Sequence, residues 1–472
     1  MTPRSWGEPT NAALDAGLAL VQQLASEKLQ LLSAQAMQHE EAQSHAAPIH
    51  EDVLAEQQQL VQQLLLAGDE EATCTSSPSV LKLALGDLQV SADIQAQLRQ
   101  LLSLGQQQHW LLDCSKVVLG EAMGQGTFGT AYRATLNASE VAVKVVHVAH
   151  EAALLNLLRE VEVLAAVRHP CVLRFLGLGV AGPAQFWLLT EFMAGGNLEA
   201  WLAKEEAVAV PRQQQGVQLG GQRQGQGSAG GGLAAAKGPA RRFAERLRIV
   251  LQVAQGLAAL HRQNPPVLHR DLKPTNVFVD SRLHARVGDF GLARRLPLEQ
   301  QAGYGPRPPP SPTAAALSGP PGLGLTCPTG TLMFMAPEVF LGNEYDAKAD
   351  VWSWGVLLVK VMAGVHPYEH LRSDEGPGWG GAGKEGSMQA FEVAVAQAAA
   401  QLDKEDFKLN IPSSWPFSLQ LLAESALHPD PDCRPLFPDI VEILRPLHAM
   451  MEKEAAREDE ACARSNTRRE HG

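Results

Sequence analysis

The sequence predicts an α+β protein in which a small antiparallel β lobe with one helix precedes a larger, mainly helical lobe. Short runs rich in β-branched residues, "KVVLGEAM" and "SEVAVKVVHV", flank a glycine-rich turn, as in an antiparallel sheet. After Gly195 apolar residues recur at helical steps, as in "AERLRIVLQVAQGLAALHRQ" and "DVWSWGVLLVKVMAG". The 472 residues suffice for both lobes and a further segment.

The first part of the chain, residues 1–109, is rich in Gln, Ala and Leu. Its apolar residues fall at helical steps in three places, of which the last comprises Ile94, Leu98 and Leu101 ahead of Gly105. The Gln-rich faces lack the alternating charges that fix a coiled-coil register, which favours a small helical bundle or a partly disordered extension. We expect this segment to bind a protein partner or to act as an autoinhibitory module.

The two lobes are expected to occupy residues 110–448, and a charged C-terminal tail follows at 449–472. Three stretches rich in Gly, Pro and Gln interrupt the lobes, near 206–239, 300–325 and 371–386. Such a composition buries too little apolar area to offset the entropy of ordering. We therefore expect each stretch to be a loop inserted in the folded body.

Charge and cysteine content exclude several classes of protein. The net charge is −12 and Lys and Arg are scattered among more numerous acids, which argues against nucleic acid as a partner. The six cysteines lie far apart without metal-ligand spacing, so we expect reduced thiols in a cytoplasmic protein. Neither a targeting segment nor an apolar run long enough for a membrane span is evident.

The turn "MGQGTFGTAY" places Gly124, Gly126 and Gly129 at G-x-G-x-x-G spacing, which dinucleotide-binding folds and plain turns share. A dinucleotide site requires a helix directly after the glycines, whereas here the strand-like run "VAVKVV" follows. Lys144 is the charged residue of that run. It is either a surface lysine on an edge strand or an ammonium group that faces a cleft and meets nucleotide phosphates.

The helix predicted by "ALLNLLREVEVLAAVRHP" offers a partner for this lysine. Glu160 is flanked by Leu157, Val161 and Leu164 at helical steps, which would seat it against the lobe. We therefore predict a pair between Lys144 and Glu160, with Glu162 as the competing acid.

A second cluster of polar residues lies in "HRDLKPTNVFVD" and in the "GDFGLA" that follows it. Asn276 and Asp289 are oxygen ligands of the kind that Mg²⁺ prefers. Asp271 is suited to accept the proton of a substrate hydroxyl, and Lys273 to offset charge on γ-phosphoryl oxygens. With "GTLMFMAPEV" downstream, these residues supply the parts that phosphoryl transfer to a hydroxyl requires.

In this order the motifs "GQGTFGTA", "VAVK", "HRDLKPTN", "DFG" and "APE" resemble the signature set of a eukaryotic protein kinase. The resemblance covers about Trp110 to His448. The stretches "WLLDCSKVVLGEAMGQGTFG", "LLTEFMAGGNLEAWL" and "HPDPDCRPLFPDIVEIL" are similar to the tyrosine-kinase-like branch of serine/threonine kinases, of the mixed-lineage and Raf type.

The resemblance implies a two-lobed protein kinase fold that uses ATP and Mg²⁺. It implies that Asn276 and Asp289 hold the metal and that Asp271, Lys273 and Asn276 are catalytic. The residues that it places around the nucleotide are Met123, Gly124, Gln125, Gly126, Thr127, Phe128, Gly129, Thr130, Ala131, Lys144, Glu160, Glu191 and Met193. Ala131 stands where valine is usual, which reduces the apolar roof over the adenine and is expected to weaken nucleotide binding modestly.

Further residues receive supporting roles from the same resemblance. Thr190 would be the gatekeeper behind the adenine, and the backbones of Glu191 and Met193 the hinge contacts. Asp350 would anchor the backbone of the catalytic loop. A buried ion pair is expected between Glu338 and Arg434.

The implied function is transfer of the γ-phosphoryl group of ATP to serine and threonine hydroxyls of protein substrates, in signalling. The alternatives are a pseudokinase scaffold that only binds nucleotide and a dual-specificity kinase. The complete set of Lys144, Asp271, Asn276 and Asp289 argues against the scaffold. Lys273 disfavours strict tyrosine specificity, as does Thr331, a hydroxyl expected to pack toward Asp271.

Control by phosphorylation is also implied, because Arg270 precedes the catalytic aspartate and is commonly matched by a phosphate on the activation segment. Thr326 is the favoured acceptor and Thr329 the second choice. Ser311, which precedes a proline, is a more remote candidate.

Overall fold

The computed structural model divides the chain into two compact units, Met1–Thr75 and Ser76–Gly472, and the residues that it describes lie in the second. These are residues 78–86, 88–126, 129–209, 238–296, 332–341, 345–365 and 410–470. Several predictions concern residues outside these ranges: the first two helices of the N-terminal segment, most of the insert near 206–239, the inserts near 300–325 and 371–386, and Thr127, Phe128, Ser311, Thr326, Thr329 and Thr331.

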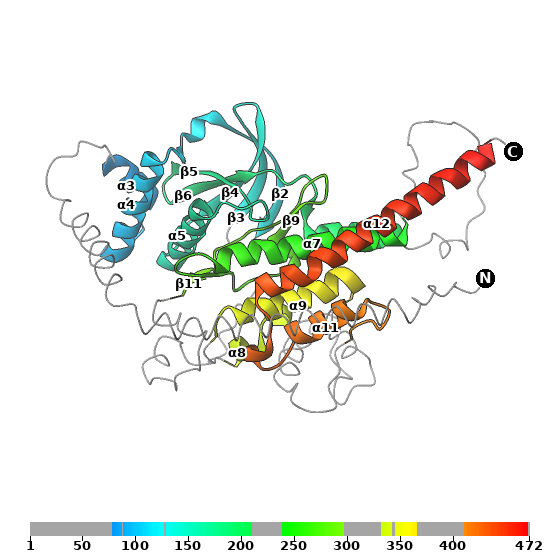
Figure 1. Ribbon diagram of the computed structural model, residues 1–472. Helices are drawn as coiled ribbons and strands as arrows, with labels where there is room; N and C mark the ends of the chain where they lie inside the picture. Colours follow the sequence, from blue (N-terminus) through cyan, green and yellow to red (C-terminus); the bar gives the residue numbers. More distant parts are fainter. Residues whose placement is uncertain are drawn as a thin grey trace, which may run out of the picture. The chain divides into compact units, whose positions relative to one another are not determined.

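The β lobe is built on a six-stranded sheet with the order β1-β5-β6-β4-β3-β2 (Figure 1). Neighbouring strands are antiparallel, except that β1 runs parallel to β5. The sheet contains β1 (Leu111–Leu112), β2 (Val117–Gly126), β3 (Gly129–Leu136), β4 (Ser139–His147), β5 (Phe175–Gly182) and β6 (Gln185–Glu191). The predicted antiparallel character of this lobe is therefore confirmed.

Alternation along β4 determines which side chain faces the functional site. Val141, Val143 and Val145 are buried in a small apolar cluster, and the intervening Lys144 points from the other face of the strand. The single helix of this lobe, α5 (Glu151–Ala166), begins at His150, whose Nδ1 accepts a hydrogen bond from the Ala153 amide at 3.2 Å. Its residue Glu160 is buried.

The second lobe is mainly helical, as its apolar periodicity predicts. It contains α6 (Leu198–Ala209), α7 (Pro239–His261), α8 (Pro337–Phe340), α9 (Lys348–Ala363), α11 (Phe417–Ala426) and α12 (Phe437–Glu470). Trp352 and Trp354 of α9 are completely buried, and the Trp354 indole nitrogen donates to the Val250 carbonyl oxygen of α7 at 3.1 Å. Because α7 and α9 are apolar on facing sides, they form the centre of this lobe.

Short strands and 3-10 turns connect the main elements of both lobes. One small sheet has the order β10-β9-β7 and another pairs β11 with β8. The strands are β7 (Gly196–Asn197), β8 (Val267–Leu268), β9 (Val277–Val279), β10 (Ala285–Val287) and β11 (Arg294–Arg295). The turns are η2 (Cys114–Lys116), η3 (Pro274–Asn276), η6 (Leu332–Phe334) and η8 (Pro431–Cys433).

Two helices of the N-terminal segment are part of the same compact unit. These are α3 (Pro78–Leu85) and α4 (Ala92–Gln107), of which α4 contacts α5 and β1. The predicted helix around Leu98 is confirmed, and its buried residues are Ile94, Leu98, Leu101, Leu102 and Gly105. The sequence prediction placed these residues ahead of the two-lobed body, whereas the structure packs them against it.

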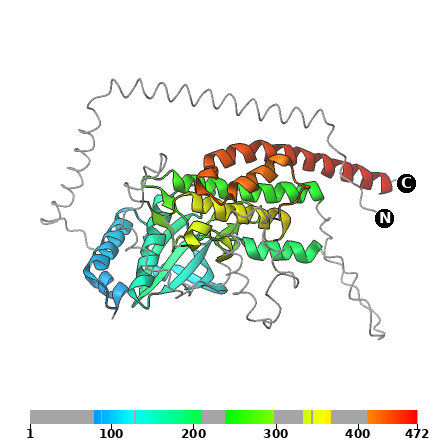
Figure 2. The same ribbon diagram turned by 90° about the horizontal axis from the view of Figure 1, so that it is seen from below.

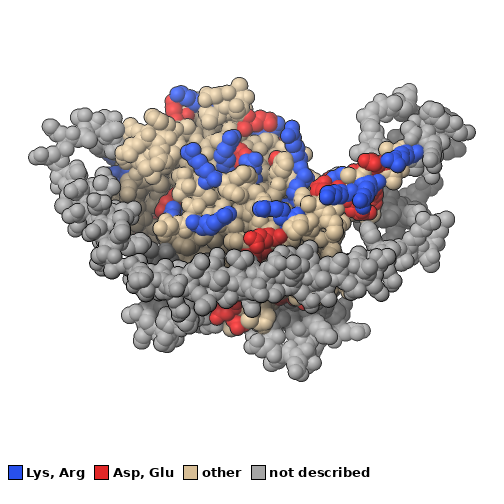
Figure 3. Space-filling model, viewed as in Figure 1, with Lys and Arg blue, Asp and Glu red and all other residues tan. Residues whose placement is uncertain are grey.

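The C-terminal tail predicted at 449–472 is helical through Glu470, because α12 continues without a break past residue 448. α12 lies along α7 in both views (Figures 1 and 2). Arg241 of α7 binds Glu452 at 2.9 Å and Asp459 at 2.7 Å. Glu458 accepts a hydrogen bond at 3.0 Å from the Ala240 amide in the first turn of α7. Towards its end α12 carries side chains of both charges (Figure 3).

Close packing of small residues at this contact leads to a prediction. Ala455 is 0% exposed and packs in one apolar cluster with Ala240 and Ala244. Ala455→Leu should lower the free energy of unfolding by about 1–3 kcal/mol, because there is no room for the added carbons. The neighbouring Ala456 is exposed, so Ala456→Leu is the matched control and should change little. Urea denaturation of both variants measures the difference, and equal stabilities would contradict this packing.

Candidate active site

Lys144 forms the predicted ion pair with Glu160. Its Nζ lies 3.0 and 2.9 Å from the two carboxylate oxygens of Glu160, and 3.3 Å from Oδ1 of Asp289. Burial opposes the charged ammonium, but the carboxylates of Glu160 and Asp289 outweigh it and raise the pKa of Lys144. The lysine is therefore a fixed cation. Glu162, the competing acid, instead binds Arg295 of β11 at 3.0 Å.

Asp271, Lys273 and Asn276 converge around the turn η3. Lys273 Nζ lies 3.1 and 2.9 Å from the two carboxylate oxygens of Asp271. The amide nitrogen of Asn276 donates to the backbone oxygen of Asp271 at 2.7 Å and to its Oδ2 at 2.9 Å. These bonds hold the Asp271 carboxylate in one orientation and leave Asn276 Oδ1 as an acceptor, which receives the Thr275 hydroxyl at 3.3 Å.

Backbone contacts place Asp289 beside this turn. The Gly288 amide donates to the Asn276 carbonyl oxygen at 2.9 Å. Asp289 itself has φ 60°, in the left-handed region that few residues other than glycine adopt readily. The next residue, Phe290, is 0% exposed and its ring lies 5.2 Å from that of His269. With Phe290 buried on one side, Asp289 turns toward Lys144 on the other.

The donor chemistry of Asn276 and Asp289 fits Mg²⁺, which prefers oxygen and is commonly bound by one or two carboxylates together with substrate phosphates and water. Within the part of the chain that the structure describes, no group of three or more His, Cys, Asp or Glu side chains is arranged to hold a metal. A metal held by Asn276 and Asp289 would therefore take its remaining ligands from substrate phosphates and water.

The glycine-rich turn forms the tip of the β2–β3 hairpin, where Gly124 pairs with Ala131 and Gly126 with Gly129. Space beside Gly124 is open, whereas a side chain at Gly129 would collide with the Val145 carbonyl oxygen. Gly129 also has φ 145°, which a residue with a side chain rarely adopts. The described residues of the predicted nucleotide loop are Met123, Gly124, Gln125, Gly126, Gly129, Thr130 and Ala131.

The segment predicted as a hinge begins at the end of β6. Thr190 is 8% exposed and pairs with Ala142 of β4. The Glu191 carboxylate forms an ion pair with Arg286 of β10 and accepts the Arg174 amide at 2.7 Å. Met193 is buried, and its carbonyl oxygen accepts the Gly196 amide at 2.9 Å. The pair of Glu191 with Arg286, which the sequence did not reveal, links the two lobes beside this segment.

Asp350 anchors the loop that carries Asp271, as predicted. Its carboxylate accepts the backbone amides of His269 at 2.8 Å and Arg270 at 2.9 Å, and it lies 2.8 Å from His261 Nε2. Burial alone would raise the pKa of Asp350, but the hydrogen bond from His261 and the other donors lower it below its ordinary value. The contribution of His261 was missed by sequence reasoning.

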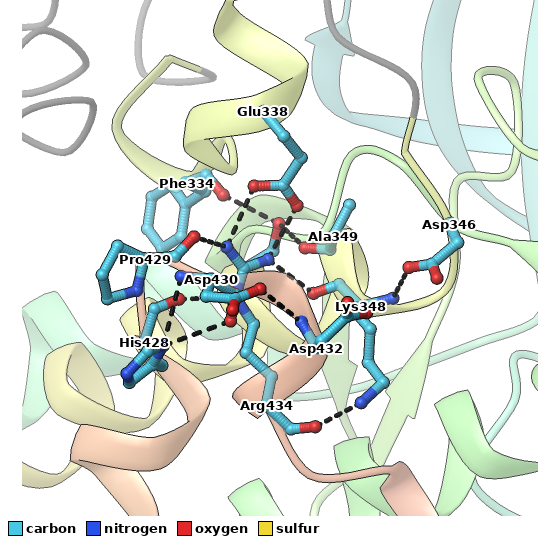
Figure 4. Close-up of polar contacts among 11 residues, drawn as sticks. Phe334, Glu338, Asp346, Lys348, Ala349, His428, Pro429, Asp430, Asp432 and Arg434 are labelled. Carbon is cyan, nitrogen blue, oxygen red and sulfur yellow. Dashed lines mark hydrogen bonds and ion pairs between the residues drawn. The ribbon is translucent and has the colours of Figure 1, made fainter. Parts of the chain in front are cut away.

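Glu338 and Arg434 form the predicted buried ion pair (Figure 4). The two guanidinium nitrogens lie 2.7 and 2.9 Å from the two carboxylate oxygens. Arg434 also donates to the carbonyl oxygens of His428, Pro429 and Lys348, at 2.8, 3.1 and 3.0 Å. Every polar atom of this guanidinium thus has a partner, which is what a charge in the interior requires.

Comparison with known proteins identifies the family. A model described as the protein kinase domain matches residues 117–444, well over half of the 472-residue chain. The chain belongs to the protein kinase family. Members of this family use ATP and Mg²⁺. The similarity to the tyrosine-kinase-like branch agrees with the relatives.

Among the relatives are three protein kinases of plant and amoebal origin. The chain is 26% identical over 360 residues to serine/threonine-protein kinase STY46 of Arabidopsis thaliana, which is 76% of this chain and 48% of the relative. It is 29% identical to serine/threonine-protein kinase CTR1 of Arabidopsis thaliana, over 69% of this chain and 31% of the relative. It is 27% identical to dual specificity protein kinase shkA of Dictyostelium discoideum, over 70% of this chain and 49% of the relative.

The chain therefore spans about half or less of the length of these relatives. Among the helices that the structure describes, none has the length and apolarity required to cross a membrane.

The lowered pKa of Asp350 predicts a pH effect on stability. Because the pKa is below its ordinary value of 3.8, the charged form stabilises the fold above about pH 4, and this contribution is lost as pH falls through the lowered pKa. Asp350→Asn should lower the free energy of unfolding by about 1.5–3 kcal/mol at neutral pH, and the difference in stability from the wild type should become smaller below pH 4. Urea denaturation from pH 7 to pH 3 tests this, with the exposed Asp432→Asn as control. A gap that stays constant over this range would refute the assignment.

Proposed function

We propose that this protein is an ATP-dependent serine/threonine kinase that acts on protein substrates in signalling. The observation that carries the proposal is the meeting of two sets of residues from distant parts of the chain. Lys144 binds both Glu160 and Asp289, and Asp289 follows the glycine whose amide binds Asn276 of the Asp271 loop. A scaffold that only binds nucleotide has no chemical need for Asp271 and Lys273 in this arrangement.

Each group has a role that follows from its charge and position. Lys144, fixed as a cation, binds the α- and β-phosphates beneath the glycine-rich hairpin, while the backbones of Glu191 and Met193 bind the adenine. Asn276 and Asp289 would hold Mg²⁺, which neutralises phosphate charge when bound. Asp271 accepts the proton of the substrate hydroxyl, and Lys273 offsets charge on the transferred group.

Serine and threonine are the favoured acceptors, since Lys273 lies against the Asp271 carboxylate and two of the reported relatives are named serine/threonine kinases. Dual specificity is the second candidate, because shkA carries that designation. We also propose that the N-terminal segment binds a protein partner. Phosphate at Thr326 or Thr329, opposite Arg270, is proposed to activate the kinase.

We place the activity in the cytoplasm. Cys114, Cys171 and Cys433 are free thiols among the described residues, which suits a reducing compartment.

Replacing the proposed base is the most direct test of this function. Asp271→Asn should lower kcat for transfer to a protein substrate by at least about 100-fold, because the amide cannot accept the proton. Lys144→Met should be as severe through loss of the phosphate contact. The exposed Asp432→Asn serves as a control for the change of charge. Radiolabel transfer measures the rates, and circular dichroism checks the fold. Wild-type rates in purified Asp271→Asn would refute the proposal.

The proposed gatekeeper predicts inhibitor sensitivity. Thr190 is small and is held by the sheet between β4 and β5. Thr190→Met should weaken the binding of bulky ATP-competitive inhibitors at least about tenfold, because the longer side chain fills the space behind the adenine. Thr135→Met, at an exposed position of β3, is the control. If parent and Thr190→Met bind several such inhibitors equally, Thr190 does not border the adenine pocket.

A further inference from the structure

α5 is enclosed on nearly all sides, although it lies at the edge of the β lobe. Its exposed residues are Ala152, Arg159, Glu162 and Ala166, which fall along one narrow stripe of the helix. All other positions are buried or half-buried. Since α5 carries Glu160, the elements that enclose the helix decide where the Glu160 carboxylate lies.

One of these elements is α4, which precedes the residues matched by the family model. α4 contacts α5, and Leu98 of α4, which is 0% exposed, belongs with Leu154 and Leu158 of α5 to the main apolar core, whose buried residues come from both lobes. At the start of the two helices, Ser91 Oγ donates to Glu151 Oε1 at 2.6 Å. Without α4, part of the apolar surface of α5 would face water, so the contact favours one position of α5 by the hydrophobic effect.

α4 is itself fixed to the sheet, so α5 packs against a helix whose position is set. The Trp110 amide donates to the Gly105 carbonyl oxygen at 2.9 Å, and the Trp110 ring fills the space that a side chain at Gly105 would need. The Trp110 carbonyl oxygen accepts the Leu178 amide of β5 at 2.9 Å, and its ring lies 5.4 Å from that of Phe175. Figures 1 and 2 both show α4 beside α5.

We infer that α4 is a built-in positioning element of the nucleotide site, and that Leu98 is its central positioning residue. By filling the outer side of α5, Leu98 holds the helix where Glu160 reaches Lys144, so the ion pair forms without a separate protein against α5. Leu98 touches neither nucleotide nor substrate and acts through Glu160. The effect on catalysis rests on the proposed function, whereas the effect on α5 and on nucleotide binding does not.

The variant Leu98→Ala tests the inference, and Leu104→Ala on the same helix is its control, because Leu104 is 38% exposed. Hydrogen exchange of the α5 amides should become at least about tenfold faster in Leu98→Ala, while the α9 amides keep the wild-type rate. The dissociation constant of a fluorescent ATP analogue should rise about three- to tenfold. Leu98→Met, which nearly conserves volume, should restore both quantities.

A double-mutant cycle separates positioning from general destabilisation. Glu160→Gln removes the charge that Leu98 is inferred to hold in place. If Leu98 acts through Glu160, Leu98→Ala should weaken nucleotide binding much less in the Glu160→Gln background than in the wild type. Should Leu98→Ala fail to fold, the milder Leu98→Val replaces it in the same cycle.

Additive effects in the cycle would overturn the inference, and so would wild-type α5 exchange in Leu98→Ala. If the wild type transfers no phosphate but the cycle shows coupling, the proposed function fails and the positioning role stands. If transfer occurs and the effects are additive, the function stands and the positioning role fails.

Discussion

The contact on which the site depends is the ion pair between Lys144 and Glu160, with Asp289 as a third charge. Each residue comes from a different element, namely β4, α5 and the segment after β10. An ammonium group taken out of water is stable only when anionic partners are at hand, so the three elements must hold one relative position for the charge to be tolerated. The arrangement therefore couples the β lobe to the loops of the helical lobe.

The helical lobe also contains buried charges that are compensated by nearby partners. Asp350 and Arg434 are both about 1% exposed, and every hydrogen bond they make reaches a backbone group or a paired side chain. Replacing such groups by apolar residues need not destabilise a protein, so their value lies elsewhere. Asp350 fixes two consecutive amides next to Asp271, and Arg434 joins α8 to the segment before α12, so these charges specify the loop conformations that the chemistry uses.

How far the sequence predicted this site depended on the range of each contact. Asp271, Lys273 and Asn276 could be grouped from the sequence because they lie within five positions of one another. The pair of Lys144 with Glu160 could be predicted from strand alternation and helix phase. The pairs of Glu191 with Arg286 and of Glu162 with Arg295 depend on tertiary packing between elements far apart in the sequence, for which spacing gives no signal. The helical tail was missed because its charged composition obscures the apolar period, although Glu460 and Arg464 stand at the i,i+4 spacing of a helical ion pair.

The two flanks of the matched domain are attached by different chemistry, and this difference bears on what each can do. The distal part of α12 holds the start of α7 in two ways, through the buried contact of Ala455 with Ala240 and Ala244 and through the partly exposed pairs of Arg241 with Glu452 and Asp459. Such pairs are weakened by salt and contribute little each. α4 contacts α5 and has a buried apolar face, and such an apolar contact is not screened by salt. Salt should therefore weaken only the polar part of the α12 contact, which lies away from Lys144, whereas by the inference above a change at α4 is transmitted through α5 to Glu160.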